Sequence, residues 1–202
     1  MVKQKYEMKT ERSLKMNEEG MVQLKGTVLA PYMQLASSLI GKARHAGGNM
    51  FRHQMDTLAI LIDYGYIDPI LLKASLVHDT IEDLSDFKED WIVNADSDGP
   101  EVHRLVLEVT KRPGENKQEF LRRIIDHGSQ KAKILKCADR ISNMISLGYV
   151  TNSEFIERYC NETEYYVLPI AIEVDFNMYQ ELINLIITRR KFREDYRKIE
   201  KK

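Results

Sequence analysis

Hydrophobic residues recur along most of this chain at the spacing of an α-helix. In "HQMDTLAILIDYG", Met55, Leu58 and Ile62 fall on one helical stripe, and Gly65 is placed to end the helix. In "SQKAKILKCADRISNMISLG" a second apolar stripe has the same period. No segment alternates apolar and polar residues with a period of two between turn signals, as a half-buried strand would. We therefore expect an all-α protein of about eight helices with little or no sheet.

Residues that favour helix starts support this prediction. Asp68 can cap "DPILLKASLVHDTIED", where Pro69 would occupy the first helical position. Asp98 can cap the next long helix, and Ser85 can cap "DFKEDWIVNA" between them. These caps divide the middle of the chain into several short helices.

The chain contains no repeats, low-complexity tracts or Pro/Gly/Ser-rich linkers that would divide it into several domains. Residues 1–20 are polar and mixed in charge, and we expect them to form an extension, as a surface or frayed helix. Residues 21–175 are predicted to form one helical domain. Residues 176–202 are predicted to form a C-terminal helix whose basic tail extends into solvent.

Composition narrows the classes of function. The 202 residues are 43% hydrophobic and 30% charged, which is typical of a soluble globular protein. A formal net charge of −1 provides no overall attraction to nucleic acid. Apolar runs are too short to span a membrane, and there is no secretory signal. Cys137 and Cys160 form no CxxC pair. We expect a cytoplasmic protein that binds neither nucleic acid nor membrane and that can be an oligomer.

The apolar segment "LKASLVHDTIEDL" ends in a group of polar, metal-seeking side chains. Neighbours on a helix point about 100° apart, so His78 and Asp79 can reach one point only at a helix end or bend. Glu82 lies four residues after His78, and Asp83 lies four residues after Asp79, which places two more acids nearby. Carboxylates this close repel one another unless a cation lies between them or one is protonated. The sequence therefore predicts a divalent metal here.

Two other predicted helices offer further ligands to such a metal. His53 opens one of them, and Asp139 lies in "ILKCADRISNM", four residues before Asn143. Together with His78 and Asp79 they form a set of two histidines and two carboxylates. A mixed nitrogen and oxygen set suits Mn²⁺, Fe²⁺ or a similar ion with water in its open positions, rather than a closed thiolate zinc site.

These motifs resemble those of the HD-domain metal phosphohydrolases, and in particular of the RelA/SpoT-type alarmone hydrolases. "ASLVHDTIEDL" resembles "ALLHDVVEDT" of that branch, and "ILKCADRISNM" resembles "LIKLADRLHNM". The intervening "LEVTKRPGENKQEFLRRI" is similar to the branch's "VTK" stretch. The likeness covers roughly residues 35–172. It implies a single HD-domain helical bundle, and the chain looks like a small stand-alone alarmone hydrolase without a synthetase domain.

The resemblance also implies an activity. It is the metal-dependent removal of the 3′-diphosphate of guanosine tetra- or pentaphosphate, giving GDP or GTP and pyrophosphate, usually with Mn²⁺. Glu82 and Asp83 would be the acid and base, with their division of labour left open. Asn143 would hydrogen-bond the ribose or a phosphate of the nucleotide. Lys136 and Arg140 would make either phosphate contacts or contacts that support the helix.

The chain departs from the family in its substrate loop. The family's "GQxRxxGxPYxxHP" is compressed here to "HAGGNMFRHQ", and both Arg44 and Arg52 are candidates for its arginine. This departure keeps two alternatives open. The first is another nucleotide phosphohydrolase on the same scaffold, such as a nucleotidase or a dinucleotide phosphatase. The second is a nucleotide sensor without catalysis.

Overall fold

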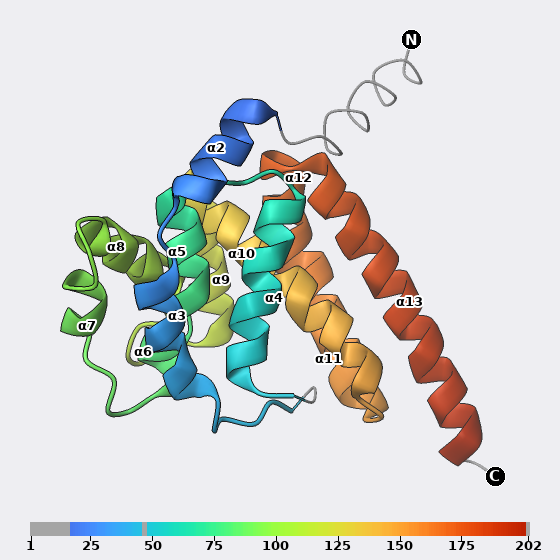
Figure 1. The fold of residues 1–202 in the computed structure, drawn as a ribbon. Coiled ribbons are helices and arrows are strands. Elements are labelled where there is room, and N and C mark those ends of the chain that lie inside the picture. Colours follow the sequence, from blue (N-terminus) through green and yellow to red (C-terminus); the bar gives the residue numbers. More distant parts are fainter. Residues whose placement is uncertain (1–16, 46–47, 201–202) are drawn as a thin grey trace.

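The computed structural model describes residues 17–45 and 48–200, and their ordered elements are helical (Figure 1). Within these ranges the only β-type contact is an isolated antiparallel bridge between Ala43 and Asn49. The all-α prediction is therefore confirmed for the described residues. The α-helices are α2 (Glu18–Gly26), α3 (Ala30–Ala36), α4 (Met50–Asp63), α5 (Pro69–Val77), α6 (Thr80–Asp83), α7 (Asp90–Val93), α8 (Gly99–Val109), α9 (Lys117–His127), α10 (Gln130–Ser146), α11 (Ser153–Glu162), α12 (Leu168–Val174) and α13 (Phe176–Glu200).

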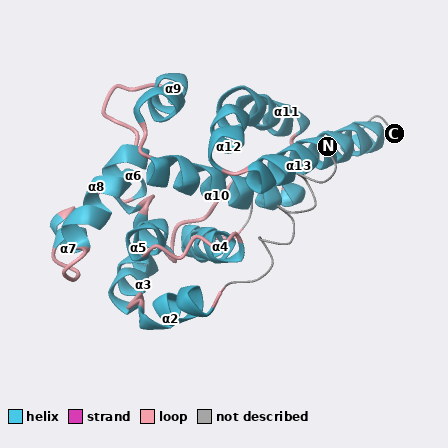
Figure 2. Ribbon diagram, turned by 90° about the horizontal axis from the view of Figure 1, so that it is seen from above, coloured by secondary structure: helices cyan, strands magenta, loops and turns pink. Residues whose placement is uncertain are grey.

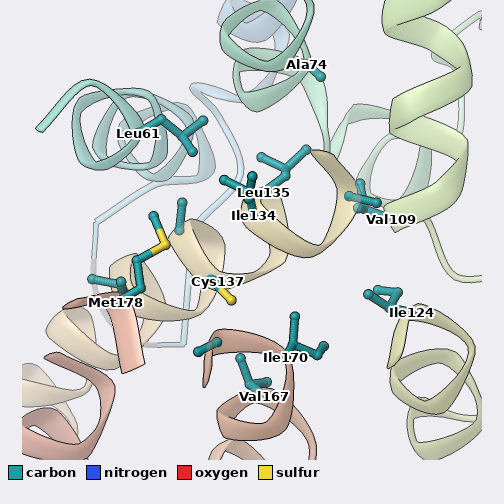
Figure 3. Packing of buried hydrophobic residues seen from close by; sticks show 14 of the residues in the cluster. Leu61, Ala74, Val109, Ile124, Ile134, Leu135, Cys137, Val167, Ile170 and Met178 are labelled. Carbon is teal, nitrogen blue, oxygen red and sulfur yellow. The ribbon is translucent and has the colours of Figure 1, made fainter. Parts of the chain in front are cut away.

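The helices surround α10, which runs through the middle of the fold. It packs against α4 and α5 on one side and against α12 and α13 on the other (Figure 2). Figure 3 shows Cys137 of α10 facing Val167 and Ile170, while Leu61 of α4 lies on the other side of α10. Because α10 is enclosed, some of its polar residues are buried, among them Asp139 and Arg140.

The caps predicted from the sequence have mixed outcomes. The side chain of Asp68 accepts the N–H of Leu71 and begins α5, as predicted. Asp98 precedes α8, but its carboxylate accepts from the buried Lys73 (2.6 Å) and not from the helix backbone. The Ser85 prediction is wrong, because α7 begins only at Asp90 and has no side-chain cap.

The helical segment that follows α10 is interrupted. α11 ends at Glu162, a π-helical turn covers Thr163–Val167, and α12 begins at Leu168 with Pro169 in its first turn. A π turn adds a residue to the helical repeat and is often found at functional sites. Here it carries Thr163 and Tyr166 into the core, next to the end of α11.

The two ends of the chain bear on the predicted domain division. Residues 1–16 of the predicted extension lie outside the described residues. At the other end, α13 packs along α10, α11 and α12 and buries Met178, Leu182 and Ile186. The division at residue 176 stays a prediction. Within the described ranges, no helix is both long enough and apolar enough to cross a membrane.

Candidate active site

Three parts of the fold bring the four predicted metal ligands together. The Nε2 atom of His53 lies 3.1 Å from Asp139 Oδ1 and 3.4 Å from Asp79 Oδ2. The Nε2 atom of His78 lies 3.2 Å from Asp79 Oδ2 and 3.9 Å from Asp139 Oδ1. His53, His78 and Asp139 each offer an atom within 4.8 Å of the other two, so one ion could contact all three.

A break in the chain direction allows His78 and Asp79 to face the same point. α5 ends at Val77, and α6 begins at Thr80. The hydroxyl of Thr80 donates to the carbonyl of Val77 (2.7 Å), which stabilises the bend. Val77 is buried, so the bend is anchored in the core. The sequence-based expectation of a helix end at this pair agrees with the structure.

The imidazole rings are oriented by hydrogen bonds on the side away from the cluster. His78 Nδ1 lies 2.8 Å from the carbonyl of Ser75, which can only accept, so Nδ1 carries the proton and Nε2 presents a lone pair. That Nε2 atom is buried and has no hydrogen-bond partner. His53 Nδ1 lies 2.8 Å from the hydroxyl of Ser142. A metal-binding histidine usually has a hydrogen-bond partner on the ring nitrogen that faces away from the metal.

The electrostatics of the cluster favour a cation. Burial alone would raise the pKa of Asp139, but the charge of Lys136 and the hydrogen bond from His53 hold that pKa well below its usual value. Burial would lower the pKa of His53, but hydrogen bonds to Asp139 and Asp79 raise it to about 9. A proton on His53 and the charge of Lys136 therefore compensate the two ionised carboxylates. A divalent ion would supply the same compensation, and its binding would release that proton.

Polar side chains around the cluster fix the carboxylates. Lys136 donates to Asp139 Oδ2 (2.7 Å), and Asn143 donates to Asp139 Oδ1 (2.5 Å). On the other carboxylate, Gln54 donates to Asp79 Oδ2 (2.9 Å). Lys136 thus contacts a candidate metal ligand and packs on the Phe120 ring, and only a small part of its side chain is exposed to a substrate.

Of the two candidate arginines, Arg44 lies at the site. Its guanidinium donates to Asn143 Oδ1 (2.6 Å) and to the hydroxyl of Ser146 (3.1 Å). Arg52 points outward from α4, with 66% of its side chain exposed, and its nearest acid is Asp56 at 3.7 Å. The structure therefore distinguishes Arg44 from Arg52, whereas the sequence left both as candidates.

Arg140 supports the helix and has no surface to offer a substrate. It is buried under the ring of Tyr159 and donates to Glu162 (2.5 Å) and to Thr163 (3.3 Å). Of the two roles that the sequence left open for Arg140, the geometry matches the structural one. The buried pair attaches α10, and with it Asp139, to the end of α11.

The two predicted proton-transfer acids are held apart by lysines. Lys42 Nζ contacts both Asp83 Oδ1 (2.7 Å) and the Asp83 carbonyl (2.5 Å). Glu82 accepts from the backbone of Lys111 (3.3 Å), whose Nζ lies 3.6 Å from it. Glu82 also lines a cavity of about 1040 Å³ bordered by residues of α6, α8 and α9. The backbone N–H of Asp83 donates to the carbonyl of Asp79 (2.8 Å). Among the described residues, the carboxylates of Glu82 and Asp83 have their partners elsewhere, on Lys42 and Lys111.

Sequence reasoning missed three residues of the site: Gln54, Lys42 and Ser142. Gln54 directly follows the candidate ligand His53, and Ser142 lies on the same helix as Asp139, four residues before Ser146. These positions could have indicated Gln54 and Ser142 as site residues. Nothing in the local sequence indicates Lys42, because its contact with Asp83 joins residues 41 positions apart.

Curated relatives and a solved structure match this chain, whereas no protein-family model does. The guanosine-3′,5′-bis(diphosphate) 3′-pyrophosphohydrolase MESH1 of Xenopus tropicalis is 33% identical over 114 residues, which are 54% of this chain and 62% of that protein. Its mouse counterpart is 31% identical over 57% of this chain and 65% of that protein. A GTP pyrophosphokinase of Streptomyces coelicolor is 29% identical over 77% of this chain and 21% of that protein.

The chain thus spans less than two thirds of the length of these relatives. A solved structure described as a metazoan ortholog of SpoT that hydrolyses ppGpp superposes with a TM-score of 0.69 at 25% identity. This match covers 80% of the present chain and 94% of that structure. In sequence and in fold, the chain is therefore similar to proteins of the RelA/SpoT type.

Proposed function

We propose that this protein is a divalent-metal-dependent hydrolase that removes the 3′-diphosphate of guanosine tetra- or pentaphosphate. The products are GDP or GTP and pyrophosphate. The observation that carries the proposal is the cluster of His53, His78, Asp79 and Asp139, in which one buried imidazole nitrogen has no hydrogen-bond partner. The names of the MESH1 relatives support the choice of substrate.

The residues present fit a divalent metal. Two histidine Nε2 atoms, Asp139 Oδ1 and Asp79 Oδ2 lie close to one another. The two histidines and Asp139 are each held at a second atom by a hydrogen bond, and Gln54 donates to Asp79 Oδ2 itself. This mixed set is hard enough for Mn²⁺ and lacks the thiolates of a structural zinc site, so we propose Mn²⁺ as the cofactor. A bound ion would stabilise charge on the phosphoryl oxygens and make water more acidic.

The chain's own acids would handle the protons. In the proposed step the oxygen of water forms a bond to the phosphorus next to the ribose 3′-oxygen, and the bond between that phosphorus and the 3′-oxygen breaks. One carboxylate of Glu82 and Asp83 accepts the proton of water, and the other delivers a proton to the departing 3′-oxygen. Asp83 is held at two points by Lys42, whereas Glu82 is 40% exposed and free to adjust to the substrate.

The nucleotide would be held by groups on one side of the cluster. Arg44 presents a planar guanidinium that can stack on a base or donate to a phosphate. Asn143 lies between Arg44 and Asp139, and its amide would contact the ribose or a phosphate. Because Arg44 and Asn143 hydrogen-bond each other in this structure, a nucleotide would replace that contact with its own.

The direct test is to incubate the purified protein with Mn²⁺ and guanosine tetraphosphate and to separate the products by anion-exchange chromatography. We expect equal amounts of GDP and pyrophosphate, and no reaction after chelation. The absence of turnover with every divalent ion tried would reject the proposal.

The altered substrate loop supports a second candidate, in which the same site hydrolyses another phosphorylated nucleotide. Where the family motif has Pro-Tyr, this chain has Asn49-Met50, and Asn49 caps α4 by accepting the N–H of Arg52 (2.9 Å). A screen of nucleoside phosphates and dinucleotides, with phosphate and pyrophosphate detection, distinguishes the two substrates. A nucleotide sensor would bind without forming any product.

A further inference from the structure

Gln54 is a polar residue whose surroundings packing alone does not explain. It follows His53 on α4 and is completely buried. Its Nε2 donates to Asp79 Oδ2 at 2.9 Å, the same oxygen that lies 3.4 Å from His53 Nε2 and 3.2 Å from His78 Nε2. Its Oε1 is buried and accepts no hydrogen bond from the described residues.

A buried amide oxygen without a partner destabilises a fold by about 1–3 kcal/mol. A methionine would fill a similar volume without that penalty. The amide orientation is also determined by its surroundings, because turning it by 180° would place Oε1 against the ionised oxygen of Asp79. The residue is therefore best explained by the hydrogen bond that its N–H group donates to Asp79.

The loop motif of the family ends in His-Pro, and proline has no side-chain donor. In this chain His53 is followed by Gln54 instead. The hydrogen bond to Asp79 is thus a feature of this chain that the resemblance does not supply. Only 25% of the Asp79 side chain is exposed, and Gln54 is the residue that fixes its Oδ2 atom by a neutral donor.

We infer that Gln54 is a positioning residue for the metal ligand Asp79. Its N–H group holds Oδ2 next to the two imidazole nitrogens, so that the carboxylate is already oriented when the ion arrives. Loss of an outer-shell partner of a metal ligand typically weakens metal affinity about 10–100-fold. The inference rests on the proposed metal site but not on the identity of the substrate.

The test measures Mn²⁺ affinity without substrate, from the electron paramagnetic resonance signal of free Mn²⁺. We expect Gln54→Met to bind Mn²⁺ about 10–100-fold more weakly than the unmodified protein. At saturating Mn²⁺, turnover should recover to within a few-fold of the unmodified protein. Unchanged Mn²⁺ affinity in Gln54→Met would overturn the inference.

Thr57→Val is the matched control. Thr57 is buried on the same face of α4, and its hydroxyl donates to the backbone carbonyl of His53, not to a ligand side chain. Its Mn²⁺ affinity should stay unchanged.

If Gln54→Met does not fold, Gln54→Asn serves instead, because its amide is one methylene too short to reach Asp79, and the same weakening is expected. A wild-type protein that binds no Mn²⁺ would overturn the metal site itself, whereas missing hydrolysis with intact binding would reject only the proposed substrate.

Discussion

The candidate metal ligands and the two candidate acids belong to neighbouring parts of the chain, but they are held in opposite ways. Three of the candidate ligands are at most 5% exposed. His53 projects from α4, His78 from the end of α5 and Asp139 from α10. Glu82 and Asp83 lie on the single turn α6, with 40% and 25% of their side chains exposed. Their partners are lysines that precede α4 or follow α8.

This difference assigns separate tasks to the two groups. The ligand cluster is fixed by core packing and by hydrogen bonds on its outer atoms, so the position of an ion would be set before the substrate binds. The acids are held by ion pairs in contact with solvent, which are weak and easily exchanged. The position of the metal is therefore a property of the core, and proton transfer is a property of groups that can adjust. The predictions below test this separation.

The largest effect is expected from Asp79→Ala, which removes one ligand. We expect loss of Mn²⁺ binding and a fall in turnover of about 10³-fold or more, because metal catalysis supplies several kcal/mol and each 1.36 kcal/mol is a factor of ten. Metal content after dialysis and initial rates measure the two effects. Unchanged turnover in the presence of a chelator would contradict the role of the cluster.

Glu82→Gln should separate chemistry from metal binding. Loss of a general acid or base slows a reaction by about 10²–10⁴-fold. Mn²⁺ affinity should remain within about twofold, because the Glu82 carboxylate pairs with Lys111 and not with a ligand side chain. Rates at saturating substrate, together with a Mn²⁺ titration, give both quantities. An undiminished rate would remove Glu82 from the mechanism.

The sequence indicated the candidate ligands because each is a polar residue on a helix that also carries an apolar stripe. The same reasoning did not show which side of α4 is buried most deeply. Met55, Leu58 and Ile62 pack against the core but are only half-buried, whereas the fully buried residues are His53, Gln54, Thr57 and Leu61. A helix that lines a polar site buries polar residues, so hydrophobic periodicity is misleading there.

Other features depend on contacts between distant segments. The π turn at Thr163–Val167 changes the register between α11 and α12, and apolar spacing alone does not reveal such an insertion. The choice between Arg44 and Arg52 required the loop and α10 to be placed together, since Arg44 reaches Asn143 across 99 positions of sequence. Local patterns predict elements and ligand types, and packing decides which charged side chains meet.

The two lysines that hold the acids should differ in importance. Lys42 makes two short contacts with Asp83. A hydrogen bond to a charged group contributes about 1.5 kcal/mol at the lower end of its range. We therefore expect Lys42→Met to slow turnover about tenfold. Lys111 lies 3.6 Å from Glu82 in solvent, and such pairs contribute at most about 1 kcal/mol, so Lys111→Met should slow it less than about fivefold.

The measurement for both lysines is kcat at saturating substrate and metal, with unchanged Mn²⁺ affinity. Lys42→Arg is the control that keeps the charge and should recover part of the rate. Equal effects of the two methionine variants would show that the ion pairs act only through general charge. A loss of Mn²⁺ binding in Lys42→Met would show that the acid pair and the ligand cluster are coupled after all.

The smallest effect on chemistry, and a clear one on stability, is expected from Glu162→Gln. Arg140 is buried, and removing one partner of a buried pair destabilises a fold by about 3 kcal/mol, which for a chain of this size is about 6–12 °C in Tm.

Burial would raise the pKa of Glu162, but the charges of Arg140 and Lys117 lower it below its ordinary value. The ionised carboxylate therefore stabilises the fold above its unfolded-state pKa of about 4.5, and this stabilisation is lost as the pH falls through the folded-state pKa. Urea unfolding between pH 7 and pH 3 should show that the free energies of unfolding of the unmodified protein and of Glu162→Gln converge as the pH falls. Glu154→Gln, an exposed change on the same helix, is the control, and its free energy of unfolding should differ from that of the unmodified protein by less than about 0.5 kcal/mol throughout. A gap of constant size down to pH 3 would mean that the ion pair does not hold α10 and its ligand Asp139 against α11.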